Sequence, residues 1–490
     1  MKAPSISTLG ALKESKYQPQ SIKDELRKNL IKVMRSGDSI FTGVKGFEET
    51  VIPDLQRAIL SRHNILLLGL RGQAKTRIAR TLTALLDDYM PIVRGSEIND
   101  DPLQPLSRYA LDTLAKNGDD TPISWVHRSE RFVEKLATPD VSVADLIGDI
   151  DPIKAAANKL SYSDERVIHY GLIPRAHRSL FVINELPDLQ ARIQVALFNI
   201  LQEGDIQIRG FKLRLPLDIQ FIFTANPEDY TNRGSIITPL KDRIESQILT
   251  HYPERVEVSK EITSQEARLA GTQVDSVDVP DLAATLLEYI TVTAREHDYT
   301  DEKSGVSMRM SISAMENLVS AAERRMILSG EAKTRVRLSD FWGVIPSITG
   351  KVELVYEGEQ AGAHEVALEF LSQAVRTQYL EFFPDPRKFD NSPERDPFDV
   401  LREYFAAGNS CLISMDADES EYRKTLQEVP GLKSFVEQHK VSNQDTYYMM
   451  ELVLHGLAEF DVLSMDIAAG RLTFGDDLAN MLDDLNDDDF

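Results

Sequence analysis

The residues from 65 to 76, ILLLGLRGQAKT, combine a short apolar run, a glycine-containing turn and a Lys-Thr pair. The four apolar residues predict a buried strand, the next six a tight loop, and Lys75 with Thr76 the first turn of a helix. In such a loop the backbone N–H groups and the helix N-terminus converge on phosphate oxygens. Lys75 could then reach the terminal phosphates of a nucleotide, and Thr76 could place its hydroxyl on a magnesium ion. The stretch therefore predicts a phosphate-binding loop.

One position of this loop departs from the usual pattern, because Ala74 stands where a second glycine is expected. Alanine adopts left-handed backbone angles poorly, although its small side chain still lets the backbone approach a ligand. An ordinary strand-to-helix turn with an incidental Gly, Lys and Thr is the alternative interpretation. We favour the phosphate loop because of its context, and the candidate nucleotide-binding residues are Phe41, Gly69, Arg71, Gly72, Gln73, Ala74, Lys75, Thr76 and Arg77.

Two later apolar runs end in polar side chains, Asn184 and Glu185 in one case and Asn226 in the other. Because α/β sheets bind ligands at the carboxyl ends of their strands, Glu185 could orient and polarise an attacking water. Asn184 stands where a carboxylate would normally hold the magnesium ion, and its uncharged amide predicts weaker metal binding. Asn226 could bond the γ-phosphate or the water. The alternatives are polar strand ends at the surface and, for Asn226, a turn before Pro227.

Two arginines could supply positive charge to the γ-phosphate. Arg243, in the sequence PLKDR, could be presented to a nucleotide held by a neighbouring subunit. Arg309 begins a predicted helix and could reach back to the same phosphate. A solvated helix arginine is the alternative for the first, and the second competes with Arg295, Arg324 and Arg325.

The elements that must position these residues are near-continuous apolar strands that alternate with helices. This pattern predicts an α/β fold with a parallel sheet covered on both faces. Residues 206–215 predict a β-hairpin, and we expect no strands after about residue 255. We divide the chain into an N-terminal helix with a flexible start (1–39), an α/β nucleotide-binding domain (40–255), a helical lid (256–350), a mostly helical C-terminal region (351–475) and an acidic tail (476–490).

The composition of the chain limits the classes of function that the protein could have. A chain of 490 residues with 42% apolar and 27% charged residues is typical of a soluble globular protein. The net charge of −23 argues against sequence-independent binding to nucleic acid. The single cysteine, Cys411, is best interpreted as a small core residue. We find neither a signal-peptide core nor an apolar run long enough to span a bilayer, so we expect a cytoplasmic protein without direct membrane insertion.

In their order along the chain, these motifs resemble those of AAA+ ATPases of the MoxR and magnesium-chelatase I-subunit clade. The resemblance covers roughly residues 40–350, and the matching elements are residues 69–76, 180–185, 224–227, 239–243 and 307–309. The loop ending in Ala-Lys-Thr is familiar among MoxR-like proteins. The predicted hairpin at 206–215 resembles the insertion before the sensor strand in this clade and in the bacterial enhancer-binding activators.

The resemblance implies a role for each candidate: Walker A for Lys75 and Thr76, the Walker B catalytic glutamate for Glu185, sensor 1 for Asn226, the arginine finger for Arg243 and sensor 2 for Arg309. Asn184 departs from the Walker B aspartate, which leaves the rate of hydrolysis open. The resemblance also implies ATP and Mg²⁺ as cofactors and a homo-oligomeric ring, usually a hexamer, with ATP at the subunit interfaces. Its members often work with a partner that carries a von Willebrand A domain.

These observations favour a P-loop AAA+ ATPase that couples ATP hydrolysis to the remodelling of a protein partner. A nucleotide-dependent assembly scaffold with little hydrolysis is the first alternative, and Asn184 motivates it. The ATPase motor subunit of a magnesium chelatase is the second. A transcription activator is less favoured, because the sequence offers neither a basic recognition helix nor a basic patch.

Overall fold

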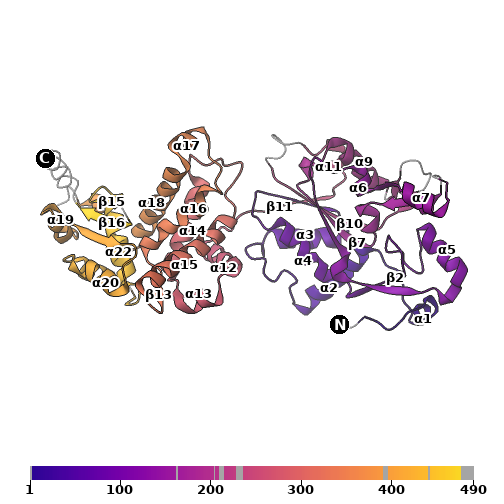
Figure 1. Cartoon of the computed structure of the whole chain (residues 1–490), viewed down its shortest axis with the longest axis horizontal. Helices are drawn as coiled ribbons and strands as arrows, with labels where there is room; N and C mark the ends of the chain where they lie inside the picture. The colour runs from indigo at the N-terminus through magenta and orange to yellow at the C-terminus, as the bar shows by residue number, and fades with distance from the viewer. Residues whose placement is uncertain are drawn as a thin grey trace. The chain divides into compact units, whose positions relative to one another are not determined.

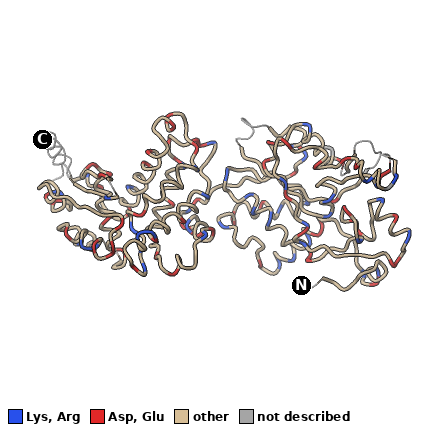
Figure 2. The backbone as a smooth tube through the Cα atoms, in the orientation of Figure 1, with Lys and Arg blue, Asp and Glu red and all other residues tan. Residues whose placement is uncertain are grey.

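A computed structural model describes residues 3–161, 164–203, 205–208, 214–227, 235–389, 396–439, 442–468 and 470–475. The chain forms two compact units, Met1–Tyr252 and Pro253–Phe490, which are the indigo-to-magenta and the pink-to-yellow parts of Figure 1. Lys and Arg residues are interspersed with Asp and Glu along both units (Figure 2). Among the described residues no helix is both long enough and apolar enough to cross a bilayer. The predicted acidic tail lies outside the described residues.

The first unit is organised around a five-stranded sheet with the order β11-β1-β10-β7-β4. Its strands are β1 (Ile65–Leu68), β4 (Phe132–Leu136), β7 (Ser179–Asn184), β10 (Ile219–Ala225) and β11 (Ser246–Leu249). Every neighbouring pair is parallel. All residues of β1, β7 and β10 are buried, because both faces of the sheet are covered. The predicted parallel α/β sheet is thus confirmed.

The two faces of the sheet enter two separate hydrophobic cores. Ile65 and Leu67 of β1 belong to the core that contains α2, α3 and α4, whereas Leu66 and Leu68 belong to the core that contains α9 and α11. This alternation follows from the two-residue period of a strand. Figure 1 shows the two groups of helices on opposite sides of the strands. The helices are α2 (Ile22–Ser36), α3 (Val51–Leu60), α4 (Lys75–Thr81), α9 (Ala191–Glu203) and α11 (Thr238–Lys241).

Smaller strand pairs extend from this unit. The predicted hairpin at 206–215 corresponds to β8 (Asp205–Gln207) and β9 (Arg214–Pro216), which are antiparallel, and residues 209–213 lie outside the described residues. Sequence analysis missed a second antiparallel pair, β5 (Gly148–Ile150) with β6 (Ile168–Tyr170). A third antiparallel pair joins β2 (Tyr89–Val93) to β3 (Ile123–His127).

The start of the chain differs from our expectation of poor order. Residues 9–14 form α1 (Leu9–Glu14), and the chain before it runs beside β3. The carbonyl oxygen of Ser7 accepts a hydrogen bond from the N–H of Ile123 at 3.0 Å, and that of Ile6 accepts one from the Trp125 indole at 2.8 Å. These two contacts with a distant strand could not be inferred from the polar composition of the segment.

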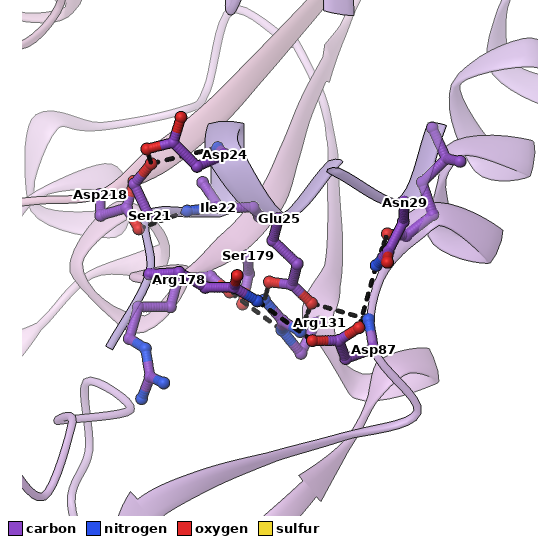
Figure 3. A network of polar contacts seen from close by, with 12 residues as sticks. Ser21, Ile22, Asp24, Glu25, Asn29, Asp87, Arg131, Arg178, Ser179 and Asp218 are labelled. Carbon is purple, nitrogen blue, oxygen red and sulfur yellow. Dashed lines mark hydrogen bonds and ion pairs between the residues drawn. The ribbon is translucent and has the colours of Figure 1, made fainter. Parts of the chain in front are cut away.

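A buried ion pair fixes α2 to the sheet (Figure 3). The Arg131 guanidinium donates to both carboxylate oxygens of Glu25, at 2.7 and 2.6 Å, and the two side chains are only 1% and 5% exposed. Arg131 also donates to the carbonyl oxygen of Arg178, at 3.0 and 2.8 Å, and Glu25 accepts from the N–H of Asp87 at 2.7 Å. Because Arg131 and Arg178 immediately precede β4 and β7, the network lies at the amino ends of these strands.

Asp218 belongs to the same network and precedes β10. One of its carboxylate oxygens accepts a hydrogen bond from the N–H of Ile22, at 2.7 Å, at the start of α2. Burial raises the pKa of the Asp218 carboxyl from its usual 3.8 to about 6, although Arg178 and Arg131 act in the opposite direction. Nearby, burial lowers the pKa of His177 from 6.5 to about 4.

We expect the Asp218→Asn variant to be more stable than the wild type at pH 7 but not at pH 4. Because the folded-state pKa is raised, Asp218 favours folding when it is protonated, and this stabilisation is lost as the pH rises from about 4 to 6. At pH 7 the charged carboxylate lowers the free energy of unfolding by roughly 2–3 kcal/mol. The side chain of Asn carries no charge, and its amide oxygen can still accept the hydrogen bond from the N–H of Ile22. Thermal melts at pH 4, 5, 6 and 7 measure the difference in Tm. A difference that stays constant with pH would contradict the assignment.

The second unit is mainly helical but contains strands. Its longer helices are α12 (Val256–Glu266), α14 (Asp281–Glu296), α15 (Arg309–Ser329), α18 (Ala363–Phe382) and α22 (Thr446–Glu459). Our expectation that strands stop at about residue 255 is wrong. Two short strands pair in parallel, β12 (Val277–Asp278) with β13 (Thr334–Arg335), and three form an antiparallel sheet, β14 (Cys411–Ser414), β16 (Arg471–Gly475) and β15 (Ser464–Ala468).

One hydrophobic core runs through this unit from Val277 to Phe474. Glu451 of α22 is fully buried and accepts the N–H groups of Leu338, at 3.0 Å, and Ser339, at 2.9 Å. The predicted lid and the predicted C-terminal region therefore share core and polar contacts, and the boundary at residue 350 stays a prediction. Cys411 is buried in this core, which raises the pKa of its thiol to about 12 and agrees with its interpretation as a core residue.

Candidate nucleotide-binding site

The predicted phosphate loop connects β1 to α4 at the carboxyl edge of the sheet. Gly72 and Ala74 both adopt left-handed backbone angles, with φ of 73° and 55°. The alanine thus takes the conformation for which glycine is usual, at a cost of about 1–2 kcal/mol. Gly69 is also constrained, because a Cβ atom there would overlap the Thr250 hydroxyl and the side-chain oxygen of Gln73. The sequence therefore specifies a tight, strained turn immediately before the helix.

Lys75, the first residue of α4, is 8% exposed and its ammonium group is turned into the loop. It donates to the carbonyl oxygens of Gly69 and Leu70, the latter at 2.8 Å, and to the side-chain oxygen of Asn226 at 2.8 Å. All of these acceptors are uncharged. An anionic phosphate oxygen would be a stronger partner for the ammonium group than any of them.

Thr76 and Asn184 meet where β7 ends. The Thr76 hydroxyl donates to the Asn184 side-chain oxygen at 3.2 Å, and the Thr224 hydroxyl donates to the same oxygen at 3.2 Å. The amide nitrogen of Asn184 donates to Glu134 of β4 at 2.6 Å. Asn184 is thereby held by residues from α4, β10 and β4.

Glu185 follows β7 in a left-handed conformation with φ of 56°. Its N–H donates to the Thr224 hydroxyl at 3.2 Å, and its carboxylate accepts from the side-chain nitrogen of Asn226 at 3.1 Å. Asn226 thus bonds Glu185 through its nitrogen and Lys75 through its oxygen. Lys75, Thr76, Asn184, Glu185 and Asn226 consequently form one connected group at the ends of three neighbouring strands.

Other predicted residues of the loop and its surroundings are placed differently. The carbonyl oxygen of Arg71 accepts from the Tyr252 hydroxyl at 2.9 Å, which ties the loop to the end of the first unit. Arg77 is exposed on α4. Phe41 is 4% exposed and belongs to the core that contains α2, α3 and α4. Contacts of these three side chains with a nucleotide stay predictions.

Of the two predicted arginines, Arg243 is not part of the connected group, and Arg309 belongs to the second unit. Arg243 lies between α11 and β11 with 35% of its side chain exposed, paired with Asp242, and its guanidinium lies 4.9 Å from the centre of the Phe198 ring. It is not buried in the core of its own subunit, so it remains accessible for the predicted intersubunit contact. Arg309 is exposed and begins α15 in the second unit.

Sequence analysis missed Glu134 and Thr250. Thr250 follows β11, and its hydroxyl bonds the Gln73 side chain at 2.7 Å, which braces the loop. Glu134 contacts Asn184 because β4 is paired with β7. The sequence shows a carboxylate at position 134, but only the pairing of β4 with β7 reveals that this carboxylate lies beside Asn184.

Comparisons with known proteins agree with this geometry. The profile of the Sigma-54 interaction domain matches residues 156–248. The magnesium-chelatase 38 kDa subunit of Cereibacter sphaeroides is 24% identical over 209 residues, which are 41% of this chain and 55% of the relative. The magnesium-chelatase subunit ChlI homolog of Methanocaldococcus jannaschii is 25% identical over 226 residues, 45% of this chain and 58% of the relative. The chain thus spans about half the length of the curated relatives it matches.

A solved structure of the complex between subunits BchI and BchD of magnesium chelatase is also similar, with 18% identity and a TM-score of 0.35 over 66% of this chain and 98% of that one. The covered parallel sheet, the phosphate loop and the polar strand ends are those of the P-loop AAA+ fold. Over less than half of its length, the chain is similar to magnesium-chelatase subunits. The resemblance stated from the motifs alone is confirmed.

Proposed function

We propose that this protein binds ATP with magnesium at the carboxyl edge of its sheet and hydrolyses it to remodel or activate a protein partner, as a MoxR-like chaperone. The observation that carries this proposal is the connected group of Lys75, Thr76, Asn184, Glu185 and Asn226. These residue types supply a cation for phosphate, oxygen ligands for a hard metal ion, and a carboxylate for water.

The proposed mechanism assigns one task to each end of the Asn226 amide. Lys75 binds the terminal phosphates after it exchanges the carbonyl oxygens of Gly69 and Leu70 for phosphate oxygens, while it keeps its hydrogen bond to Asn226. Glu185 orients the attacking water and accepts its proton. Because Asn226 bonds both side chains, it sets the distance between the carboxylate and the ammonium group, and thus between the water and the γ-phosphate.

Magnesium fits the pair formed by Thr76 and Asn184. Their side-chain oxygens lie 3.2 Å apart, and oxygen atoms are the ligands that Mg²⁺ prefers. The ion would neutralise charge on the β- and γ-phosphate oxygens. Both protein ligands are uncharged, so the fit supports a site for a metal that arrives with the nucleotide rather than a site that holds the ion alone.

Hydrolysis in this proposal takes place between subunits of a homo-oligomeric ring, which we infer to be a cytoplasmic hexamer. Arg243 is the finger that neutralises the γ-phosphate of a neighbour's ATP, supported by its position near the surface and by its exposed partner Asp242. Arg309 acts as the second sensor. A partner with a von Willebrand A domain is the proposed recipient, and neither nucleic acid nor the membrane interior is a proposed ligand.

The Lys75→Ala variant tests nucleotide binding. We expect it to lose ATP affinity and at least about 10²-fold of the ATPase rate, because the phosphate loses its cationic partner. A fluorescent ATP analogue measures affinity and phosphate release measures the rate. Lys28→Ala, on the exposed surface of α2, is the control that should change neither. If Lys75→Ala retains both affinity and rate, the proposed function is wrong.

Two alternatives each rest on one observation. Asn184 favours a nucleotide-dependent scaffold that forms a ring with little hydrolysis, and the similarity to magnesium-chelatase subunits favours a chelatase motor. A scaffold would show negligible wild-type turnover, a ring that forms with ATP, and a rate that rises in Asn184→Asp. A chelatase motor would support magnesium insertion into a tetrapyrrole when it is mixed with candidate partner subunits.

A further inference from the structure

The Glu134 carboxylate lies beside Asn184, the position at which a Walker B motif normally has an aspartate. It lies on the edge strand β4, opposite Val182 of β7, while Leu136 lies opposite Asn184. Its side chain is 27% exposed and reaches along the sheet to the end of β7. One carboxylate oxygen accepts from the Asn184 amide nitrogen at 2.6 Å. The distance is shorter than usual for an N–H donor, and the acceptor is a charged carboxylate.

This hydrogen bond determines which end of the Asn184 amide faces the proposed metal site. A carboxylate can only accept, so the NH₂ group of Asn184 must point to Glu134 and the oxygen must point to Thr76 and Thr224. In the opposite orientation the NH₂ group would face the metal, and it has no lone pair to offer a cation. Glu134 therefore fixes the only orientation of Asn184 that can bind magnesium.

The other oxygen of Glu134 accepts from Arg80 of α4 at 2.7 Å. An ordinary surface ion pair is thus the competing explanation for Glu134. The Arg80 side chain is 64% exposed, so water and salt screen this pair and its contribution is small. Arg80 also occupies only one oxygen, which leaves the other for Asn184. The ion pair holds the carboxylate in place but does not account for the contact with Asn184.

We propose that Glu134 is a positioning residue for the divalent cation that accompanies the nucleotide. It orients the Asn184 oxygen toward the ion and supplies, from the neighbouring strand, the negative charge that residue 184 lacks. Outer partners of metal ligands commonly contribute in this way. The inference rests on the proposed nucleotide site and extends it, because it predicts that magnesium binding depends on β4, a strand that carries none of the motifs.

The test distinguishes the effect of the negative charge of Glu134 from its effect on the orientation of the Asn184 amide. Glu134→Gln keeps an oxygen that can accept from Asn184 but removes the charge, whereas Glu134→Ala removes both. The dissociation constant of a fluorescent ADP is measured in EDTA and in Mg²⁺. The constant in EDTA divided by the constant in Mg²⁺ is the magnesium gain, the factor by which the ion tightens ADP binding. We expect Glu134→Gln to lower this gain about 10-fold and Glu134→Ala up to about 100-fold, with affinities in EDTA unchanged. Glu130→Gln, an exposed residue four positions upstream, is the control that should keep the wild-type gain.

A double variant that moves the carboxylate from residue 134 to residue 184 should restore the magnesium gain. In the double variant Glu134→Gln/Asn184→Asp the charge stands on residue 184, and the gain should return to within about threefold of the wild type. Asn184→Asp alone brings two carboxylates together, and their repulsion should lower Tm in EDTA and enlarge the rise in Tm on adding ADP and Mg²⁺.

The outcomes distinguish this inference from the proposed function. An unchanged magnesium gain in Glu134→Gln and Glu134→Ala, or a double variant that is not rescued, would overturn the role of Glu134 and leave the nucleotide site intact. Equal ADP affinity of the wild type with and without Mg²⁺ would do the same. A wild type that binds no nucleotide under either condition would overturn both.

Discussion

The Glu185→Gln variant is expected to bind ATP as tightly as the wild type and to hydrolyse it about 10²–10⁴ times more slowly. Its amide oxygen can still accept from Asn226, as the carboxylate does at 3.1 Å, so the geometry around Lys75 is retained. The amide cannot take the proton of the attacking water. Binding of a fluorescent ATP analogue and single-turnover phosphate release measure the two effects separately.

The same variant can identify the partner, because a complex that requires bound ATP should persist when hydrolysis is blocked. Proteins that co-purify with Glu185→Gln in ATP, and not with Lys75→Ala, are the candidates. Glu130→Gln serves as the charge-matched control for turnover. If Glu185→Gln hydrolysed ATP at the wild-type rate, the carboxylate would not be the base. Negligible turnover of the wild type itself would favour the scaffold.

The parts of the fold that the sequence predicted are those with strong local patterns. The strands β1, β7 and β10 are buried on both faces, so their sequences are almost continuously apolar. In β14, buried and more exposed residues alternate instead. In β14, Cys411 and Ile413 are buried while Leu412 is 43% exposed. Four or five residues of such alternation cannot be distinguished from a helix turn or a loop.

In the candidate site, too, the predictable residues are those that belong to a local sequence pattern. Lys75 and Thr76 were predictable because the phosphate loop is continuous in sequence and its chemistry depends on spacing alone. The contact between Glu134 and Asn184 depends on the pairing of β4 with β7, which are separated by more than forty residues. No local pattern determines that pairing. Arg243 is a third case, since its predicted partner belongs to another subunit and neither the sequence nor one chain contains it.

Removal of the buried carboxylate in Glu25→Ala is expected to lower the unfolding free energy of the first unit by about 3–5 kcal/mol. The reason is that Arg131, which is 1% exposed, would keep its charge and lose both hydrogen bonds to Glu25. The N–H of Asp87 would also lose its acceptor. In a Trp342→Phe background, Trp125 is the remaining tryptophan and reports the first unit in urea titrations of the full chain.

Two further variants decide whether the unpaired charge is the cause. Asp24→Ala, the neighbouring position on α2, removes an exposed ion pair with Arg62 and should cost less than about 1 kcal/mol. The double change Glu25→Leu/Arg131→Met removes both buried charges, so it should be less destabilising than Glu25→Ala even though it deletes more hydrogen bonds. A double variant at least as unstable as Glu25→Ala would mean that the loss of the hydrogen bonds from Arg131 to the Arg178 carbonyl outweighs the removal of its uncompensated charge.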